Sequence, residues 1–263
     1  MKVTAAIVCS TDHLIKRCLK SIPLTTPIIV VLNYPDDSVL NICKKEERVT
    51  IYLYDERNLG KLRQIAVDNC KTDAILFVDS DCYLEDNVIS EVEKSLDIYY
   101  AVNVPVRYDW VGVETKITSL CRLFNTPDNR LFMPFAFRLS LQDKIGKLFN
   151  EKLFWGEDTD QRLRMEKHGI KYGISNCIIH HKPLTFFEDA KSSYRIGRGT
   201  FIQVKNGVVK PRRLLKDLSI VHEIKNSYKC TIFTKSFCAG LYHFFVWRPS
   251  FKWGYYMARR KIT

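Results

Sequence analysis

The chain has 263 residues, 46% of them hydrophobic, and a formal net charge of +12, which suits one large domain or one domain with an appendage. It has no run of 18 apolar residues, and the apolar segment Val3–Cys9 is too short for a signal peptide core, so we expect neither a membrane span nor a leader. Nine scattered cysteines without a Cys-x-x-Cys pair argue against a zinc cluster or a disulfide scaffold and favour buried thiols in a reducing, cytoplasmic compartment.

Strand and helix patterns alternate along the first part of the chain, which predicts an α/β domain with a mostly parallel sheet covered on both faces. Dinucleotide-binding and P-loop glycine motifs are absent, which disfavours oxidoreductases and P-loop enzymes. The predicted elements are strands at 3–9, 27–32, 50–54 and 74–78, a turn at 33–37, and helices over 12–22, 58–70 and from 86 through Leu96, the first and last capped by Asp12 and Asp86.

Two carboxylates follow the apolar strand at 74–78, as Asp79-Ser80-Asp81. Open α/β sheets bind ligands at the carboxyl ends of their strands. Aspartates two residues apart can hold one hard divalent cation against phosphate oxygens. The alternative is that Asp79 and Asp81 only begin a turn or cap the next helix.

A second acidic group stands at Trp155-Gly156-Glu157-Asp158. The glycine allows a sharp turn, after which Thr159 or Asp160 can cap a helix that runs to about 168 and stops at Gly169. One carboxylate here can take a proton from an attacking hydroxyl, and Trp155 can stack on a sugar ring. The alternative is that these acids only favour the helix dipole.

A third group, His180-His181, follows two isoleucines that predict a strand ending at a pocket. Imidazole can complete a metal site begun by Asp81. A surface or structural role is the alternative for such a pair.

The C-terminal part differs in composition from the rest. Residues 205–263 contain 13 lysines and arginines against two acids and many aromatic residues, so we expect a main domain at 1–204 and a basic aromatic helical extension at 205–263. This mixture is typical of a helix in an anionic membrane interface, which would make the protein peripheral on a membrane. The alternatives are a docked subdomain with a solvated basic face and a nucleic-acid surface, and we expect no nucleic acid.

The order of these groups resembles inverting glycosyltransferases of the GT-A fold, of the family 2 type. Trp155-Gly156-Glu157-Asp158 also resembles the acceptor motif of β-1,4-galactosyltransferases. The resemblance covers about 3–200 and rests on Asn58-x-Gly60, Asp79-Ser80-Asp81, Ile145–Asn150, Gly156-Glu157-Asp158, His180 and Ser193–Gly199. The family's usual Asp-Asp-x-Ser after the second strand is replaced here by Leu32-Asn33-Tyr34-Pro35-Asp36-Asp37, which leaves the base of the nucleotide open.

The resemblance implies a role for each matching position. Asp81 would ligate Mn²⁺ or Mg²⁺, and Asp79 would contact the ribose of the nucleotide or the water shell of the metal. His180, or else His181, would be a further metal ligand. Asp158 would be the general base, and Glu157, Trp155 and Gly156 would hold the acceptor. Contacts to the nucleotide sugar are implied for Ser10, Asp12, Asn33, Asn58, Lys61, Arg63, Asp79 and Ser80.

The function these roles imply is metal-dependent, inverting transfer of a hexose from a nucleoside-diphosphate sugar to a hydroxyl of a glycan or polyprenyl-linked acceptor. A UDP-sugar is the favoured donor, with a GDP-sugar as the second choice. Two other functions stay open at this point. One is a sugar-phosphate nucleotidyltransferase, and the other is a non-catalytic module that binds an anionic surface or nucleic acid through its C-terminal segment.

Overall fold

The computed structural model describes residues 1–126, 133, 135–153, 155–209 and 219–262, and of residues 220, 261 and 262 it describes the backbone alone. The chain divides into two compact units. Unit 1 comprises Met1–Arg107 and Asp128–His181, and unit 2 comprises Tyr108–Pro127 and Lys182–Thr263. The division that we predicted at 204/205 falls at the last residue of helix α8 (Phe186–Lys205), inside unit 2.

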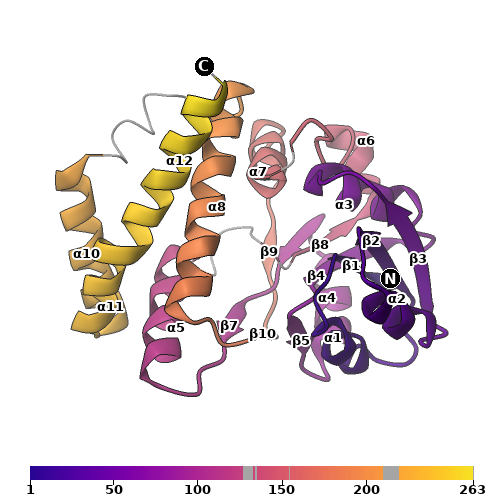
Figure 1. The fold of residues 1–263 in the computed structure, drawn as a ribbon. Helices are drawn as coiled ribbons and strands as arrows, with labels where there is room; N and C mark the ends of the chain where they lie inside the picture. Colours follow the sequence, from indigo (N-terminus) through magenta and orange to yellow (C-terminus); the bar gives the residue numbers. More distant parts are fainter. Residues whose placement is uncertain (127–132, 134, 154, 210–218, 263) are drawn as a thin grey trace. The chain divides into compact units, whose positions relative to one another are not determined.

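Among the described residues of unit 1, a seven-stranded sheet has the order β3-β2-β1-β4-β8-β6-β9 (Figure 1). The first four strands are parallel, with Ile7 opposite both Val30 and Val78, whereas β8 is antiparallel to β4 and β6. The predicted α/β fold with a mostly parallel sheet is therefore confirmed. The strands are β1 Val3–Cys9, β2 Ile28–Asn33, β3 Val49–Tyr54, β4 Ala74–Asp79, β6 Ala101–Asn103, β8 Phe135–Arg138 and β9 Gly173–Ile174.

Helices cover both faces of this sheet, because successive strand residues point to opposite sides. Ala5 and Ile7 pack with α1, α2 and α4, whereas Ala6 packs in the other cluster, with side chains of α3, η1, α6 and α7. The elements are α1 Ile15–Ser21, α2 Asp37–Lys44, α3 Leu59–Asp68, α4 Val88–Leu96, η1 Leu139–Leu141, α6 Gln142–Ile145 and α7 Glu157–Lys167.

Three helix starts differ from the prediction. Helix α2 replaces part of the predicted turn, because Asp36 Oδ1 accepts a hydrogen bond from the Val39 backbone N–H at 2.8 Å and caps it. Asp12 accepts from the Leu14 N–H at 3.0 Å and so closes the turn before α1 rather than capping the helix itself. Asp86 does not cap α4, which begins after Asn87 without a side-chain cap.

A second sheet has the order β5-β10-β7, with β5 at Cys82–Leu84, β10 at Ile179–His181 and β7 at Val106–Tyr108. In the antiparallel pair β5–β10, His181 lies opposite Cys82 and His180 opposite Tyr83. Both histidines are therefore the last residues of a strand, in line with the strand end that we predicted at this place.

The described elements of unit 2 are helical. Its core contains Cys121, Tyr242, Trp247 and Phe251. Asp189, which is buried, pairs with Arg122 and accepts a hydrogen bond from the Tyr242 hydroxyl at 2.8 Å, so its charge is compensated. The helices are α5 Val113–Asn125, α8, α10 Ile220–Thr234, α11 Phe237–Tyr242, η2 His243–Trp247 and α12 Arg248–Ile262.

The last three of these elements are continuous in the chain, and η2 is a π-helical turn just before Pro249. Proline lacks the N–H for the regular helical bond, which accounts for a wider turn at this place. Helix α12 then packs closely along α8: a Cβ atom added to Gly197 would lie 1.9 Å from the Phe251 carbonyl oxygen. In the part of the chain that the structure describes, no helix has the length and apolar character needed to span a membrane.

Candidate functional site

The carboxyl ends of the parallel strands bring several predicted donor-site residues to one edge of the sheet. Asp79 is the last residue of β4 and lies opposite Val8 of β1, and Asn33, the last residue of β2, lies opposite Tyr54 of β3. Ser10, Asp12 and Ser80 follow β1 and β4 directly. This edge is where α/β sheets bind ligands.

Asp12 joins two of the loops at this edge. Its Oδ2 accepts a hydrogen bond from Ser80 Oγ at 2.8 Å, and its Oδ1 accepts from the Leu14 N–H. Both carboxylate oxygens therefore have protein partners. Ser10 is exposed, with its hydroxyl 3.5 Å from the Tyr34 carbonyl oxygen.

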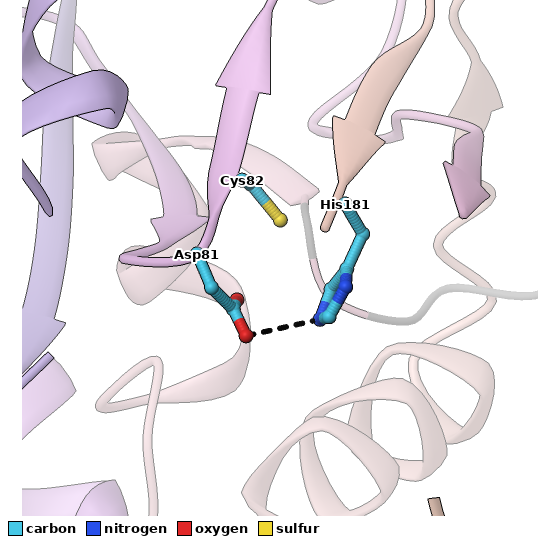
Figure 2. A group of neighbouring side chains, drawn as sticks. All are labelled: Asp81, Cys82 and His181. Atoms are coloured by element: carbon cyan, nitrogen blue, oxygen red, sulfur yellow. Dashed lines mark ion pairs between the residues drawn. The ribbon is translucent and has the colours of Figure 1, made fainter. Parts of the chain in front are cut away.

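Asp81 and His181 form the centre of the site. Asp81 Oδ2 lies 3.3 Å from His181 Nε2, and one ligand atom from each of Asp81, Cys82 and His181 lies within 4.8 Å of the others. Figure 2 shows the carboxylate and the imidazole pointing toward one another, from the turn just before β5 and from the end of β10. The register of the β5–β10 pair, which sets His181 opposite Cys82, brings these groups together across about 100 residues of sequence.

His180 points to a different set of partners. Its Nε2 lies 3.2 Å from Glu85 Oε1, and its ring stacks on Tyr83 with the centroids 4.9 Å apart. Neighbouring residues of a strand point to opposite faces, so His180 and His181 cannot both face Asp81. We named His180 first as the further ligand, and the structure instead sets His181 beside Asp81.

The donor set of Asp81 and His181 fits a divalent cation such as Mn²⁺. Carboxylate oxygens suit hard cations, and a neutral imidazole is a common metal ligand. Burial raises the pKa of the Cys82 thiol well above its usual value, with Asp79 and Asp81 adding to the effect. A thiolate is a soft ligand, whereas Mn²⁺ and Mg²⁺ favour harder oxygen and nitrogen ligands, so Asp81 and His181 fit such an ion better than Cys82 does.

The second acidic group begins helix α7. Gly156 has φ +80°, a left-handed conformation that other residues adopt only with strain, and it is the N-cap. Thr159 and Asp160, which we predicted as caps, lie inside the first turn because this glycine starts the helix earlier. The predicted stop is confirmed, since α7 ends at Lys167 and Gly169 has φ +66°.

Arg63 connects the two acidic groups. It is buried, forms an ion pair with Glu157, and its Nη2 lies 3.8 Å from Asp79 Oδ1. Burial lowers the pKa of Arg63, and the charges of Asp79 and Asp158 oppose this change. We predicted a nucleotide-sugar contact for Arg63, and in the structure its closest ion-pair partner is Glu157. The sequence contained a signal for this burial, because Arg63 lies between Leu62 and Ala66 on the buried face of α3.

Asp158 is half-buried beside this ion pair. Its Oδ1 accepts a hydrogen bond from the Thr159 N–H at 2.6 Å. Burial raises the pKa of the Asp158 carboxyl, and the charge of Arg63 limits the increase. A raised pKa suits a group that must accept a proton during the reaction.

Buried polar atoms near Asp158 have unused bonding capacity. Glu157 Oε2, Arg63 Nε and both amide atoms of Gln161 lack hydrogen-bond partners among the described residues. Such atoms are rare in folded proteins. Of these residues, Gln161 was not singled out from the sequence, whereas Arg63 and Glu157 were.

Three other predicted donor-site residues have partners within the protein: two asparagines bond to the backbone, and one lysine pairs with a carboxylate. Asn33 Nδ2 donates to the Tyr54 and Glu56 carbonyls, and Asn58 caps α3 and donates to the Glu151 carbonyl at 2.6 Å. Lys61 Nζ lies 3.3 Å from Glu56 Oε2. These side chains shape the loops at the sheet edge.

Unit 1 also contains an open cavity of about 580 Å³. Asn58 and Lys61 line it, but Asp79, Asp81 and Asp158 do not. The half-buried Trp155, predicted to bind the acceptor, precedes Gly156 directly.

The sequence of this chain matches the family described as glycosyl transferase family 2 over residues 8–156. This span is more than half of the chain. The chain belongs to glycosyl transferase family 2. The family 2 match includes Asp79-Ser80-Asp81 and ends at Gly156, so Glu157, Asp158 and both histidines lie beyond it. No curated protein matches the sequence.

Solved structures resemble the family 2 chain over all or part of its length. TarS of S. aureus, residues 1–349, in complex with UDP-GlcNAc, has a TM-score of 0.52 at 14% identity, with 99% of this chain and 92% of that chain covered. A second structure of TarS residues 1–349 has a TM-score of 0.51 at 14% identity, with the same coverage. GalNAc-T7 with UDP, GalNAc and Mn²⁺ has a TM-score of 0.51 at 14% identity and covers 69% of this chain and 44% of that chain. The predicted GT-A fold is confirmed.

Proposed function

We propose that this family 2 protein transfers a hexose from a nucleoside-diphosphate sugar, with a divalent cation, to a hydroxyl of a glycan or polyprenyl-linked acceptor. The observation that carries the proposal is the pairing of Asp81 with His181 at 3.3 Å beside the carboxyl end of β4. A carboxylate and an imidazole at this edge form a site for a cation that binds a diphosphate.

A UDP-sugar is the proposed donor. TarS with UDP-GlcNAc and GalNAc-T7 with UDP and Mn²⁺ share the fold, which supports UDP over GDP. Ser10, Asp12 and Ser80 are the residues proposed to contact the nucleotide, since they follow the strands at this edge. Asp79, whose side chain is 46% exposed, is proposed to face the ribose or the water shell of the cation.

The proposed cation is Mn²⁺ or Mg²⁺, held by Asp81 and His181. When bound there, it supplies positive charge that stabilises the departing nucleoside diphosphate.

Asp158 is the proposed general base. Its carboxylate accepts the proton of the acceptor hydroxyl as the hydroxyl oxygen attacks the anomeric carbon. Attack from the face opposite the leaving diphosphate inverts this carbon in one displacement. The diphosphate leaves as an anion and needs no acid, so one carboxylate is sufficient, unlike the pair in a glycoside hydrolase.

Trp155 is proposed to form the acceptor side, and Glu157 is given a different role. Trp155 offers an apolar ring for a sugar face. Glu157 is 2% exposed and bound to Arg63, so we propose that it positions the start of α7, and with it Asp158, rather than binding the acceptor directly.

The first experiment measures the thermal stability of the full chain with UDP, GDP, CDP or dTDP, each with Mn²⁺, Mg²⁺ or EDTA. Binding at 100 times Kd adds about 2.7 kcal/mol to the free energy of unfolding. We expect stabilisation by UDP that requires metal and is lost in Asp81→Ala. No stabilisation by any diphosphate contradicts the donor site.

The second experiment identifies the product. Wild-type protein is incubated with UDP-sugars and the released nucleotide is measured. A transferase releases UDP, whereas a sugar-phosphate nucleotidyltransferase releases pyrophosphate from a nucleoside triphosphate and a sugar phosphate. Pyrophosphate as the product would replace this proposal with the second function.

A further inference from the structure

Helix α10 presents a row of apolar side chains to solvent. Val221, Ile224, Tyr228 and Ile232 are 60%, 55%, 66% and 59% exposed. Their spacing of three or four residues places them on one face of the helix. We call these four residues the α10 stripe. Contiguous exposed apolar surface of this kind marks an interaction site.

The opposite face of α10 is buried and includes the polar side chains of Glu223 and Ser227 beside Cys230. Glu223, Ser227 and Cys230 are at most 8% exposed. Ser227 Oγ lies 3.0 Å from His243 Nδ1, which fixes this face against η2. A surface helix of a soluble protein normally buries its apolar side chains and exposes its polar ones. Helix α10 does the reverse, so the α10 stripe is built for a surrounding other than water.

Lysines border the α10 stripe. Lys225 and Lys229 are exposed, lie one turn apart, and each follows a stripe residue directly. Residues 219–262 contain eight lysines and arginines and a single acid, Glu223. Glu223 is buried and lies 2.7 Å from Lys252 Nζ. The side chains that α10 exposes around its stripe therefore carry positive charge without a neighbouring carboxylate.

We propose that the α10 stripe docks into the interfacial layer of an anionic lipid bilayer. The apolar side chains would enter the boundary between headgroups and acyl chains, while Lys225 and Lys229 bind anionic headgroups. Tyrosine, present at the centre of the α10 stripe as Tyr228, is enriched at this depth of membranes. The inference rests on unit 2 alone and does not depend on the proposed transferase activity.

Charge distinguishes a bilayer from a second copy of the chain as the occupant. Two copies that paired their α10 stripes around a twofold axis would bring four lysines together. Glu223 is buried on the opposite face and cannot neutralise them. Like charges that meet without a counter-charge weaken association. An anionic lipid surface supplies this counter-charge.

Flotation of the full-length protein with vesicles tests the proposal. The vesicles are phosphatidylcholine alone, or phosphatidylcholine with about 30% phosphatidylglycerol as the anionic lipid. The variants are Lys225→Glu with Lys229→Glu, and Ile224→Asp. The matched controls are Lys16→Glu with Lys20→Glu, an exposed pair with the same spacing on α1, and Ile98→Asp at another exposed isoleucine.

We expect the wild type and both controls to float with anionic vesicles and to bind neutral vesicles much more weakly. Each lysine contributes about fivefold to binding, so the double lysine variant should bind at least about 25-fold more weakly. Ile224→Asp should also lose binding, with its thermal stability and its UDP-dependent stabilisation unchanged.

Equal flotation of the α10 variants and their controls overturns the proposal. So does a protein that ignores vesicles but changes from dimer to monomer on gel filtration in Ile224→Asp, because this result assigns the stripe to a second copy. Failure of UDP binding in the wild type contradicts only the proposed transferase, since vesicle binding is measured without nucleotide.

Discussion

Arg63 and Glu157 form a buried ion pair that ties helix α3 to the first turn of α7. The two residues are 94 positions apart in sequence. Because Arg63 Nη2 also lies 3.8 Å from Asp79, one guanidinium connects the strand end with Asp79 to the turn that carries Asp158. The proposed donor side and the proposed base thus share a common support inside unit 1.

Loss of this arginine should destabilise the protein strongly. Arg63→Met leaves Glu157 buried without a counter-charge, which costs about 3–5 kcal/mol of the free energy of unfolding. Replacing both partners, Arg63→Met with Glu157→Leu, should recover most of this loss, because an apolar pair of similar volume is often neutral. Urea denaturation measures the free energy of unfolding of the wild type, of Arg63→Met and of the double variant. As a control, Arg162→Met removes the exposed pair with Glu166 and should cost only about 0.3–0.5 kcal/mol. A double variant as unstable as the single one contradicts the pairing.

The two histidines of β10 should behave differently. His181→Ala removes the partner of Asp81. It should weaken the affinity for UDP, measured in the presence of Mn²⁺, by roughly tenfold or more, which is the scale of effects at metal sites. His180→Ala loses only the contacts with Glu85 and Tyr83 and should keep the affinity. Isothermal titration with UDP and Mn²⁺ gives both values. Equal losses in the two variants would remove His181 from the proposed site.

Much of the fold could be predicted from the sequence because its strands are buried apolar runs. Val3–Cys9 was predicted with the observed bounds, and the strand at 74–78 is one residue longer in the structure. Such strands can be predicted without knowing which strands they pair with, because burial on both faces makes them continuously apolar. Helix α2 was missed because the turn residues Asn33, Tyr34 and Pro35 concealed the cap at Asp36.

The parts of the site that depend on pairing between distant segments could not be predicted. Sequence order suggested the Asp-x-Asp, Glu-Asp and His groups, but only the β5–β10 register selects His181 over His180. In the same way, the family resemblance implied a nucleotide-sugar contact for Arg63. Its burial follows from its place on the inner face of α3, and its partner Glu157 follows only from the tertiary structure.

Asp158→Asn should remove transfer and leave donor binding intact. General base catalysis contributes roughly 10²- to 10⁴-fold to a rate, so kcat should fall by about this factor while the Kd for UDP stays unchanged. The fold should tolerate the amide, whose carbonyl can still accept from the Thr159 N–H. Asp160→Asn is the control, because Asp160 lies in the same first turn but pairs with Arg164. A variant of Asp158 with full transfer would move the base elsewhere.

Close packing of α8 on α12 predicts a steric effect of a single methyl group. A Cβ at Gly197 would meet the Phe251 carbonyl at 1.9 Å, so Gly197→Ala should destabilise unit 2 by about 1–3 kcal/mol. Nothing lies within 4 Å of the corresponding Cβ at Gly112, which makes Gly112→Ala the matched control. Thermal unfolding of the two variants decides this, and an equal melting temperature for both would contradict the close contact.

The pH dependence of transfer should report on Asp158. Burial raises the pKa of this carboxyl, while Arg63, Arg162 and the Thr159 hydrogen bonds lower it, so the active carboxylate should be lost at a higher pH than for an ordinary aspartate. The rate should be constant above this pKa and fall about tenfold per pH unit below it. Protonation of a group whose pKa is raised by folding favours the folded state, so unfolding at this residue is not the cause of the lost rate. Rates and melting temperatures measured over the same pH range separate the two effects. If the residual activity of Asp158→Asn shows the same fall in rate at low pH as the wild type, the fall is due to the titration of another group.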